Sequence, residues 1–471
     1  MKKQKRFQNE GENIVEFYIK EMELYNFRKF GGISFALNPR MNVFVGKNAS
    51  GKTTVLEAAT IIAGAYLSSF KKYVPSRFVQ NIADKDVYLK NSNVVGGRKD
   101  LKQYMVAVPS SHSAKQFPCK VGAKIAWLGE SAECQRILEK AGGRTKFYSD
   151  NPFRDDVQKW EEAIKRVDSS SQKYIFPIVL YMSSARLWNE NRNQQNLEAL
   201  PSRLDAYQRC LDGKRSSQMA FSYLRLMQNI ALEENDGKQF GAYKEIMAAI
   251  KYALKDELEK GQYVRFMSRY GELVIENADG TILHFDSLSD GYRNVIKIVV
   301  DVAARMCILN PQLGEDVLKQ TPGIVIIDEL DLSLHPTWQR RIVGILKTLF
   351  PKVQFICATH SPFIIQSLDE GELRVLDGDL AEKYTGRSIE DIAEDIMFVD
   401  MPQYSEKKKA MLNAAQDYLT ALNNADSEEK ITELQEKLEN LQALYGDNPA
   451  YYAVLRMEKM KKEADNNASG R

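Results

Sequence analysis

The sequence has few cysteines, and none is spaced to hold a metal. Its five cysteines, an odd number in 471 residues, include no Cys-x-x-Cys pair. A small disulfide-stapled secreted domain has a higher cysteine density and usually an even number, and a structural zinc site needs closely spaced ligands. We therefore expect free thiols in a reducing cytoplasm and no zinc site.

Long apolar runs and an excess of charge of one sign are also missing. The most apolar stretch, 296–308, is interrupted by Lys297, Asp301 and Arg305, and residues 1–12 lack the apolar core of a secretory signal. Lysine and arginine total 65 against 63 acidic residues, a net charge of +2. This balance excludes a chain-wide basic field for gripping nucleic acid. The sequence predicts a cytoplasmic protein with no membrane partner.

The hydrophobic content of 44% is sufficient for a large core. Apolar strands are expected at 17–24, 41–45, 104–108, 120–127, 174–181, 324–327 and 353–358, and helices at 53–66, 218–260, from 291 and at 336–349. Between the helical region at 218–260 and the helix from 291, the stretch 264–285 is typical of short strands joined by turns, with one turn at Asp279-Gly280. Strands that alternate with helices predict a parallel sheet.

A glycine-rich motif follows the expected strand at 41–45. Residues 46–53 read Gly-Lys-Asn-Ala-Ser-Gly-Lys-Thr and fit the pattern GxxxxGK[ST] in full. Glycine lets successive backbone N–H groups surround phosphate oxygens, and the following helix adds its positive end. Lys52 then reaches the terminal phosphates, and the Thr53 hydroxyl binds Mg²⁺. A glycine-rich turn without a ligand is the weaker interpretation, because a strand and a helix flank the motif in the required order.

Two carboxylates end a buried strand far along the chain. Residues 323–329 read Gly-Ile-Val-Ile-Ile-Asp-Glu. An aspartate in this position can hold Mg²⁺ through water, and the neighbouring glutamate can orient and deprotonate an attacking water. Many core strands end in acids, so Asp328 and Glu329 become informative only in combination with the phosphate loop. Together the two motifs predict binding of ATP with magnesium, followed by hydrolysis.

Two further motifs accompany this pair. Leu-Ser-Asp-Gly-Tyr-Arg at 288–293 precedes an expected helix, so Ser289 is either an ordinary N-cap or part of an anion site. The expected strand at 353–358 runs into Thr-His-Ser-Pro. A lone histidine usually has only a structural partner, but its place at a strand end makes His360 a candidate sensor of phosphate.

These motifs, in this order, resemble the ABC ATPase head shared by chromosome-maintenance, RecF and overcoming-lysogenization-defect (OLD) ATPases. Asn-Phe-Arg-Lys-Phe at 26–30 is similar to the typical opening of these proteins, Leu-Ser-Asp-Gly resembles the ABC signature, and Asp331 matches the D-loop. The likeness covers about 17–66 and 262–380. It implies an α/β P-loop fold, with a mixed sheet, flanking helices, an inserted subdomain and a C-terminal helical bundle.

On this likeness the chain divides into four parts. They are the N-terminal part of the head at 14–66, an inserted lid and helical region at 67–260, the C-terminal part of the head at 261–400, and a helical tail at 401–471. The tail is rich in Glu, Lys, Leu, Gln and Ala with an apolar helical stripe, which is typical of a packing or dimerising element.

The resemblance also implies roles for individual residues. Glu329, His360 and Lys52 are the catalytic candidates, and Thr53 and Asp328 are the candidates for holding Mg²⁺. The residues expected at the nucleotide are Arg28, Gly46, Asn48, Ala49, Ser50, Gly51, Lys52, Thr53, Thr54, Ser289, Gly291 and Asp331. In this family the signature serine of one subunit completes the ATP site of another, which implies a homodimer or higher homo-oligomer with shared sites.

A closer likeness extends over most of the chain. The runs at 289–311, 321–343 and 354–365 are similar to bacterial ATPases of anti-phage systems, namely the PtuA subunits of Septu and ATPases of retron systems. Such ATPases pair with an HNH endonuclease. The likeness therefore implies a nucleotide-dependent dimeric switch that controls a partner nuclease of the PtuB type.

Some features of the related ATPases cannot be placed in this sequence. Gln80, Gln103 and Gln194 all lack a convincing Q-loop context. Too few residues follow position 380 for the TOPRIM nuclease domain of OLD proteins, and the acidic pair at 377–379 is better explained by turn chemistry. The chain is therefore predicted to carry an ATPase but no nuclease.

Two alternative functions stay open at this stage. One is a RecF-like repair ATPase that clamps DNA when it binds ATP, and the other is the nucleotide-binding subunit of a transporter. Nucleic acid is a further candidate partner through two basic clusters. The first comprises Arg186, Arg192 and Arg203, and the second comprises the lysines at 407–409 and 459–462. A charge run is more often only a solvated face.

Overall fold

The chain folds into two units, at residues 1–387 and 388–471. The computed structural model describes residues 16–70, 74–75, 79–91, 113–165, 174–187, 197, 199–213, 218–233, 237–256, 258–267, 270, 272–377, 384, 386–423, 430, 432–433 and 436. The expected strand at 104–108 lies outside these residues, as does most of the expected tail beyond 423.

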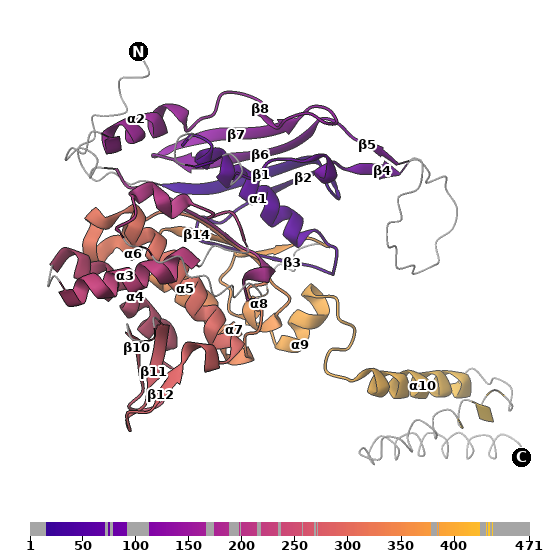
Figure 1. Ribbon diagram of the computed structural model, residues 1–471. Helices are drawn as coiled ribbons and strands as arrows, with labels where there is room; N and C mark the ends of the chain where they lie inside the picture. The colour runs from indigo at the N-terminus through magenta and orange to yellow at the C-terminus, as the bar shows by residue number, and fades with distance from the viewer. Residues whose placement is uncertain are drawn as a thin grey trace, which may run out of the picture. The chain divides into compact units, whose positions relative to one another are not determined.

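A five-stranded parallel sheet forms the centre of the first unit (Figure 1). Its order is β15 (Leu373–Val375), β3 (Met41–Val45), β14 (Val353–Ala358), β13 (Gly323–Ile327) and β9 (Ile178–Met182). All strands except β15 are buried along their whole length. A parallel sheet covered on both faces has this continuous apolar character. Because the strands run in one direction, their carboxyl ends share one edge.

A second sheet in the same unit is antiparallel. Its order is β2 (Phe30–Ala36), β1 (Phe17–Phe27), β6 (Cys119–Trp127), β7 (Glu130–Leu138) and β8 (Lys146–Phe147). The pairing of β1 with β6 shifts register between Ile19 and Glu21. The buried Gln354 of β14 bonds there, because its amide oxygen accepts the Ile19 N–H at 2.8 Å and its amide nitrogen donates to the Ile19 carbonyl at 2.8 Å. This amide links the two sheets.

Helix α1 (Lys52–Leu67) lies between the sheets. It contacts β13 and β14 on one side and β6 and β7 on the other (Figure 1). Nearly all of its residues are buried, as expected for a helix that is apolar on every face. Its last turn carries Tyr66, whose hydroxyl lies 3.0 Å from that of Tyr207. Burial raises the pKa of Tyr66, so this phenol stays neutral at the centre of an aromatic cluster.

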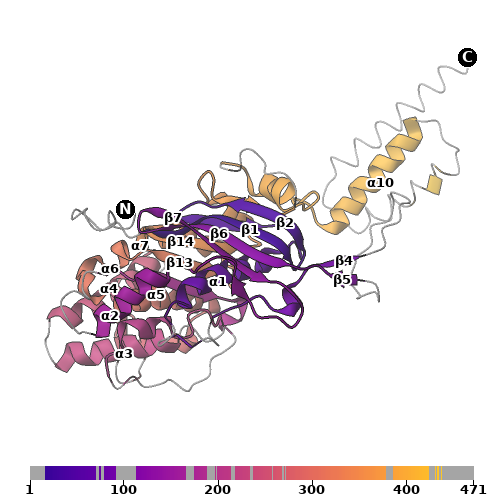
Figure 2. The same ribbon diagram turned by 90° about the horizontal axis from the view of Figure 1, so that it is seen from above.

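Further helices belong to the first unit. They are α3 (Gln218–Glu233), α4 (Gly237–Leu254), α5 (Asp290–Leu309), α6 (Val317–Gln320), α7 (Pro336–Leu349) and α8 (Pro362–Gln366), with α2 (Arg154–Lys165) near the antiparallel sheet. Helices α3, α4, α5 and α6 group on one side of the unit in the view from above (Figure 2). Helix α5 packs against α3, α4, α7 and β9. Its buried Arg305 bonds Asp301 at 2.7 Å on the same helix, so a buried charge has a partner one turn away.

Two smaller sheets complete the first unit. One is three-stranded and antiparallel, formed by β10 (Tyr263–Met267), β11 (Glu272–Glu276) and β12 (Ile282–His284). The other pairs β4 (Leu89–Asn91) with β5 (Ser113–Lys115). The turn expected at Asp279-Gly280 joins β11 to β12, with Gly280 at φ 81°.

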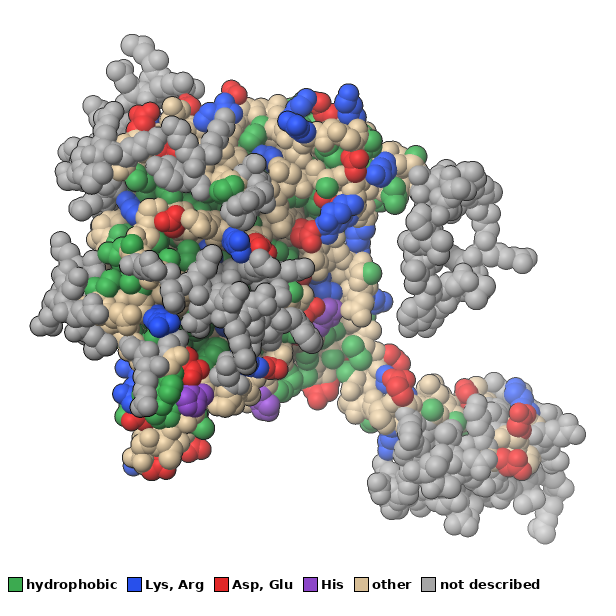
Figure 3. Space-filling view, in the orientation of Figure 1, with side chains coloured by type: hydrophobic (Ala, Val, Ile, Leu, Met, Phe, Trp, Pro, Cys, Tyr) green, Lys and Arg blue, Asp and Glu red, His purple; other side chains and the backbone are tan. Residues whose placement is uncertain are grey.

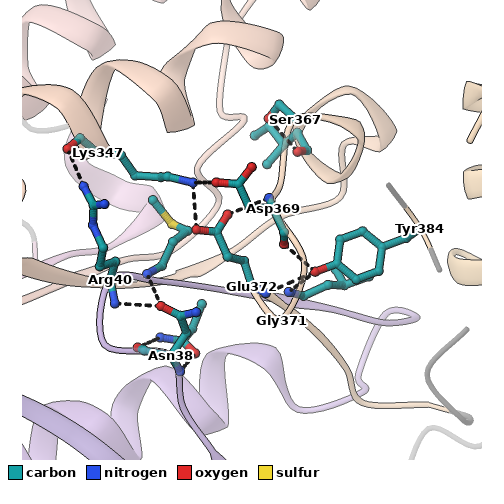
Figure 4. Close-up of polar contacts among 12 residues, drawn as sticks. Asn38, Arg40, Lys347, Ser367, Asp369, Gly371, Glu372 and Tyr384 are labelled. Carbon is teal, nitrogen blue, oxygen red and sulfur yellow. Dashed lines mark hydrogen bonds and ion pairs between the residues drawn. The ribbon is translucent and has the colours of Figure 1, made fainter. Parts of the chain in front are cut away.

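A polar network holds the amino-terminal edge of the parallel sheet (Figure 4). The Lys347 ammonium at the end of α7 bonds Asp369 and also Glu372, the latter at 2.8 Å. The Tyr384 hydroxyl donates to the Asp369 carbonyl at 2.6 Å and accepts the Glu372 N–H at 3.1 Å. These contacts fix the turn that enters β15, at the edge opposite the carboxyl edge where the phosphate loop and the acidic strand end lie.

The described part of the second unit contains helical segments joined by turns. Ser388 and Asp391 form a reciprocal capping box at the start of a short helical segment, α9 (Ile389–Asp391), which continues as a π-helical turn to Ile396. Helix α10 (Glu406–Asn423) follows. It lies in the stretch predicted to be a helical tail.

The α/β P-loop fold expected from the motifs is confirmed, and its two five-stranded sheets are one parallel and one antiparallel. The stretch 67–260 contributes β6, β7 and β8 to the antiparallel sheet and β9 to the parallel sheet. These four strands therefore belong to the two large sheets of the head, although they lie in the stretch that was expected to be an inserted region. Within the described residues, no helix combines the length and apolar character needed to span a membrane.

Candidate nucleotide site

The phosphate loop connects β3 to α1 at the carboxyl edge of the parallel sheet. Gly51 has φ 102° and Ala49 has φ 65°, both left-handed backbone conformations. A Cβ added at Gly51 would lie 2.7 Å from a ring carbon of Phe30, and one at Gly46 would lie 2.7 Å from Ser50 Oγ. Glycine is therefore required at both positions, by backbone angle and by space.

Two side chains of the loop point to an anionic ligand. The Lys52 ammonium turns back over the loop and donates to the Gly46 carbonyl at 2.8 Å and the Lys47 carbonyl at 3.1 Å. Burial lowers the pKa of Lys52, although Asp377 and Asp328 oppose this shift. The Ser50 hydroxyl is buried without a hydrogen-bond partner. A positive charge and an unsatisfied donor inside one glycine-rich loop fit a phosphate group.

The residues expected to hold Mg²⁺ come together although they lie far apart in the sequence. The Thr53 hydroxyl donates to Asp328 Oδ2 at 3.2 Å. Burial raises the pKa of Asp328, and the hydrogen bond from Thr53 only partly offsets that effect. Mg²⁺ prefers hard oxygen ligands and is usually held by one or two protein groups with phosphates and water. Within the described part of the chain, no cluster of three metal-ligating side chains exists, and this pair of oxygens fits the ion.

Glu329 begins the turn that leaves β13. Its φ is 48°, which is uncommon for a residue with a side chain. Its carbonyl accepts the Leu332 N–H at 3.0 Å, and the Leu330 N–H bonds the Ala358 carbonyl at 2.9 Å. These bonds hold the turn against the end of β14, and Glu329 directly follows the Asp328 that bonds Thr53.

Asp331 ties the turns after β13 and β14 together. Its Oδ1 accepts the Thr359 hydroxyl and the His360 N–H, the latter at 3.2 Å. The His360 residue is exposed at the sheet edge. The D-loop aspartate and the switch histidine of the expected site are therefore neighbours.

The signature motif starts helix α5. Ser289 takes the N-cap position, but its exposed side chain makes no capping hydrogen bond. A Cβ at Gly291 would lie 2.9 Å from the Ser333 carbonyl, so the helix start packs closely on the turn after β13. Asn294 donates to the Leu332 carbonyl at 2.7 Å and reinforces this contact.

Arg28 pairs with acidic side chains beside the loop. Its guanidinium pairs with Glu57 of α1 and with Asp86, the latter at 2.9 Å. The next residue reaches the loop directly, because the Lys29 ammonium donates to the Ala49 carbonyl at 3.1 Å. Asn48 is exposed and Thr54 is buried on α1.

Two residues of the site, Asp377 and Arg186, were not predicted from the sequence. Asp377 Oδ2 accepts the Lys47 N–H at 3.0 Å, so this residue does more than form a turn after β15. Arg186 bonds the carbonyls of Asp328 and Glu329 at 2.6 and 2.7 Å. The position of Arg186 four residues after a buried strand was the available signal, because carboxyl ends of parallel strands share one edge.

Two of the arginines proposed to contact nucleic acid are wrongly assigned. The Arg186 side chain is buried, and the half-buried Arg203 bonds the carbonyls of Leu309 and Tyr174. Both guanidiniums donate to backbone carbonyls of the chain itself. Arg192 lies outside the described residues. On the face drawn in Figure 3, basic and acidic side chains are interspersed and form no single positive field.

Comparison with known proteins places this geometry in a family. A model described as an AAA domain matches residues 21–261, just over half of the chain, and a second AAA-domain model matches 182–366. A retron Vc95 probable ATPase of Vibrio cholerae is 23% identical over 77% of this chain and 74% of its own length. A Septu protein PtuA of Bacillus thuringiensis is 30% identical over 38% of this chain and 46% of its own length.

Among solved structures, the SMC head domain from Thermotoga maritima aligns with 76% of this chain and 94% of its own length, at 14% identity and a TM-score of 0.41. The chain belongs to the AAA-domain family. Proteins similar to it include a probable ATPase of a retron system and the PtuA protein of Septu.

We expect the buried charge of Asp328 to lower the free energy of unfolding of the ligand-free protein. Because the pKa of Asp328 is raised in the folded state, folding becomes less favourable as the pH rises through that pKa. Asp328→Asn removes the charge and keeps an acceptor for Thr53. At neutral pH and without nucleotide, it should raise Tm by on the order of 1–3 °C in thermal unfolding.

The difference in Tm should shrink as the pH is lowered and Asp328 itself becomes neutral. The exposed Asp150 provides the control, since Asp150→Asn should leave Tm nearly unchanged across the same pH range. A Tm for Asp328→Asn that lies below wild type by the same amount at every pH would contradict the electrostatic explanation.

Proposed function

We propose that this protein binds and hydrolyses ATP, and that it acts as a nucleotide-dependent dimeric switch controlling a partner nuclease in anti-phage defence. The contact between the Thr53 hydroxyl and Asp328 carries the proposal. It joins the phosphate loop to the acidic strand end and leaves Glu329 as the next residue. This is the spatial relation that phosphoryl transfer to water requires.

Each residue of the site has a distinct chemical task. Lys52 and the loop N–H groups bind the β- and γ-phosphates, and Thr53 and Asp328 hold Mg²⁺, which neutralises charge on the phosphate oxygens. Glu329 orients a water molecule for attack on the γ-phosphorus and accepts its proton. His360 lies at the neighbouring strand end and contacts the terminal phosphate. Arg28 supports the loop from the side of α1.

Glu329→Gln tests the proposed general base. The amide keeps the size and hydrogen bonding of the side chain but cannot accept the proton of water, so hydrolysis should slow by about 10²–10⁴-fold. Affinity for ATP should stay near that of wild type, as measured by titration with a fluorescent nucleotide. Hydrolysis at the wild-type rate would overturn the assignment of Glu329.

Two further variants accompany this experiment, one that tests ATP binding and one that serves as a control. Lys52→Ala should weaken ATP binding itself by roughly 10–100-fold, since a charge-assisted hydrogen bond contributes about 1.5–3 kcal/mol. The exposed Glu370 offers a matched control, and Glu370→Gln should change neither binding nor hydrolysis.

The signature motif supports the dimeric part of the proposal. Ser289 is exposed at the N-terminus of a 20-residue helix and is not used for capping. A helix start of this kind binds anions. In the proposed dimer, Ser289 of one subunit faces the γ-phosphate held by Lys52 of the other. ATP then joins the subunits, and loss of the γ-phosphate loosens them.

Complementation between two inactive chains tests the shared site. Lys52→Ala and Ser289→Arg should each abolish ATP hydrolysis in a pure dimer. In a mixed dimer, one composite site carries both lesions and the other carries neither, so mixing should restore up to about half of the wild-type activity per dimer. Formation of the mixed dimer is verified independently with two affinity tags.

Restoration fails either if the site is not shared or if both sites must act together. The Glu329→Gln variant separates these cases, because it should bind ATP and hydrolyse it only slowly. If ATP does not strengthen dimerisation of Glu329→Gln in sedimentation experiments, the shared-site proposal is wrong.

The partner nuclease is the third part of the proposal. The similar proteins named for retron and Septu systems support a role in defence, and the motif likeness implies an HNH partner. We expect purified protein with Mg²⁺ and ATP to leave plasmid DNA intact, and to permit cleavage only when an HNH protein encoded beside it is added. DNA cutting by the pure chain, abolished by a point mutation within it, would contradict this prediction. ATP-dependent DNA clamping without any partner would favour a RecF-like role.

A further inference from the structure

Arg186 lies beneath the turn that carries Glu329. It belongs to a short 3-10 turn, Ser184–Leu187, that directly follows β9, the strand next to β13. Its side chain is 6% exposed. Burial lowers the pKa of Arg186 to about 10, which leaves the guanidinium charged at neutral pH. The fold therefore retains a buried cation directly beside the acidic strand end.

The guanidinium bonds three different elements of the site. One terminal nitrogen donates to the Asp328 carbonyl at 2.6 Å, and the other donates to the Glu329 carbonyl at 2.7 Å. The Nε–H donates to Asn294 Oδ1 of α5 at 2.8 Å. These acceptors lie on the acidic strand end at Asp328, on the turn after it and on helix α5, which the signature motif starts.

The carbonyls of Asp328 and Glu329 lie on either side of the Glu329 Cα. The Asp328 carbonyl belongs to the peptide group before the Glu329 Cα, and the Glu329 carbonyl belongs to the peptide group after it. The relative orientation of these two groups defines the backbone angles of Glu329. That residue has φ 48°, a conformation that costs on the order of 1 kcal/mol for a residue with a side chain. A single guanidinium thus holds both peptide groups of a strained residue.

Asn294 extends this arrangement to the signature helix. Its oxygen accepts from Arg186, and its amide nitrogen donates to the Leu332 carbonyl at 2.7 Å. Leu332 in turn donates its N–H to the Glu329 carbonyl at 3.0 Å. The four residues form a closed ring of hydrogen bonds that joins the start of α5 to the turn of Glu329.

We propose that Arg186 is a positioning residue for ATP hydrolysis: it sets the backbone conformation from which Glu329 projects, and through Asn294 it couples that conformation to the signature helix. The inference rests on the proposed function of Glu329 as general base. Arginine is suited to this task because its planar fork presents donors in fixed directions, whereas a lysine ammonium is a point charge that cannot reach the same acceptors together.

The test compares Arg186→Lys with a matched control, Arg203→Lys. Arg203 is half-buried and also bonds backbone carbonyls, but those carbonyls belong to Leu309 and Tyr174, away from the site. We expect Arg186→Lys to lower kcat about 100-fold, the scale of a small misplacement of a reacting group, and to change KM for ATP by less than about threefold. Arg203→Lys should retain wild-type kcat per folded molecule, whatever its Tm.

A double variant distinguishes positioning from a general structural role. If Arg186 acts through Glu329, adding Arg186→Lys to Glu329→Gln should reduce single-turnover hydrolysis by less than about threefold beyond Glu329→Gln alone, because coupled residues are non-additive. A full further 100-fold loss would overturn the inference.

Asn294→Ala keeps the experiment decisive if Arg186→Lys does not fold. It breaks the ring of hydrogen bonds at α5 and should lower kcat about tenfold with KM nearly unchanged. Wild-type kcat in either variant, or equal losses of kcat and nucleotide affinity, would refute the positioning role. Absence of hydrolysis by wild type with saturating ATP and Mg²⁺ would instead refute the proposed function, and the inference with it.

Discussion

The burial of helix α1 between two sheets is the constraint on which the site depends. The phosphate loop is only as rigid as the strand before it and the helix after it, and α1 is enclosed by β13 and β14 on one side and β6 and β7 on the other. Thr53, in the first turn of α1, reaches Asp328 because α1 packs across the strand that separates β3 from β13. A shift of α1 would separate the two oxygens that fit Mg²⁺.

The same packing creates an electrostatic cost. Lys52 and Asp328 are both taken partly out of water, and burial moves the pKa of each toward its neutral form. A polyphosphate with Mg²⁺ supplies the counter-charges that the protein alone lacks. Nucleotide binding and stability of the head are therefore linked, because a ligand that binds only the folded state stabilises it. The charges of the site are therefore balanced only when a polyphosphate with Mg²⁺ is bound.

Much of the fold was predictable from the sequence, because its central strands are continuous apolar runs and its motifs stand at their ends. The strand at 41–45 and the strand ends at Asp328 and His360 follow from local pattern alone. The antiparallel sheet was less predictable, since β1 pairs with β6, almost a hundred residues away. Arg186 and Asp377 belong to no local motif, and the parallel pairing of β9 and β15 brings them to the shared edge. Their positions just after these strands were the only sequence signal for a place in the site.

The hydrogen-bonded ring around Glu329 links the proposed anion site at the start of α5 to the proposed general base. The proposed switch must combine these two functions. The start of α5 carries the exposed Ser289, and the next turn of the same helix carries Asn294, which bonds both Arg186 and the Leu332 carbonyl. Because a helix moves as a rigid element, an anion held at Ser289 constrains the position of Asn294. A change of about 1.4 kcal/mol in the energy of this ring alters a rate tenfold, and one or two hydrogen bonds have that magnitude. In the proposed dimer, the contacts at the start of α5 would therefore couple subunit contact to the rate of hydrolysis.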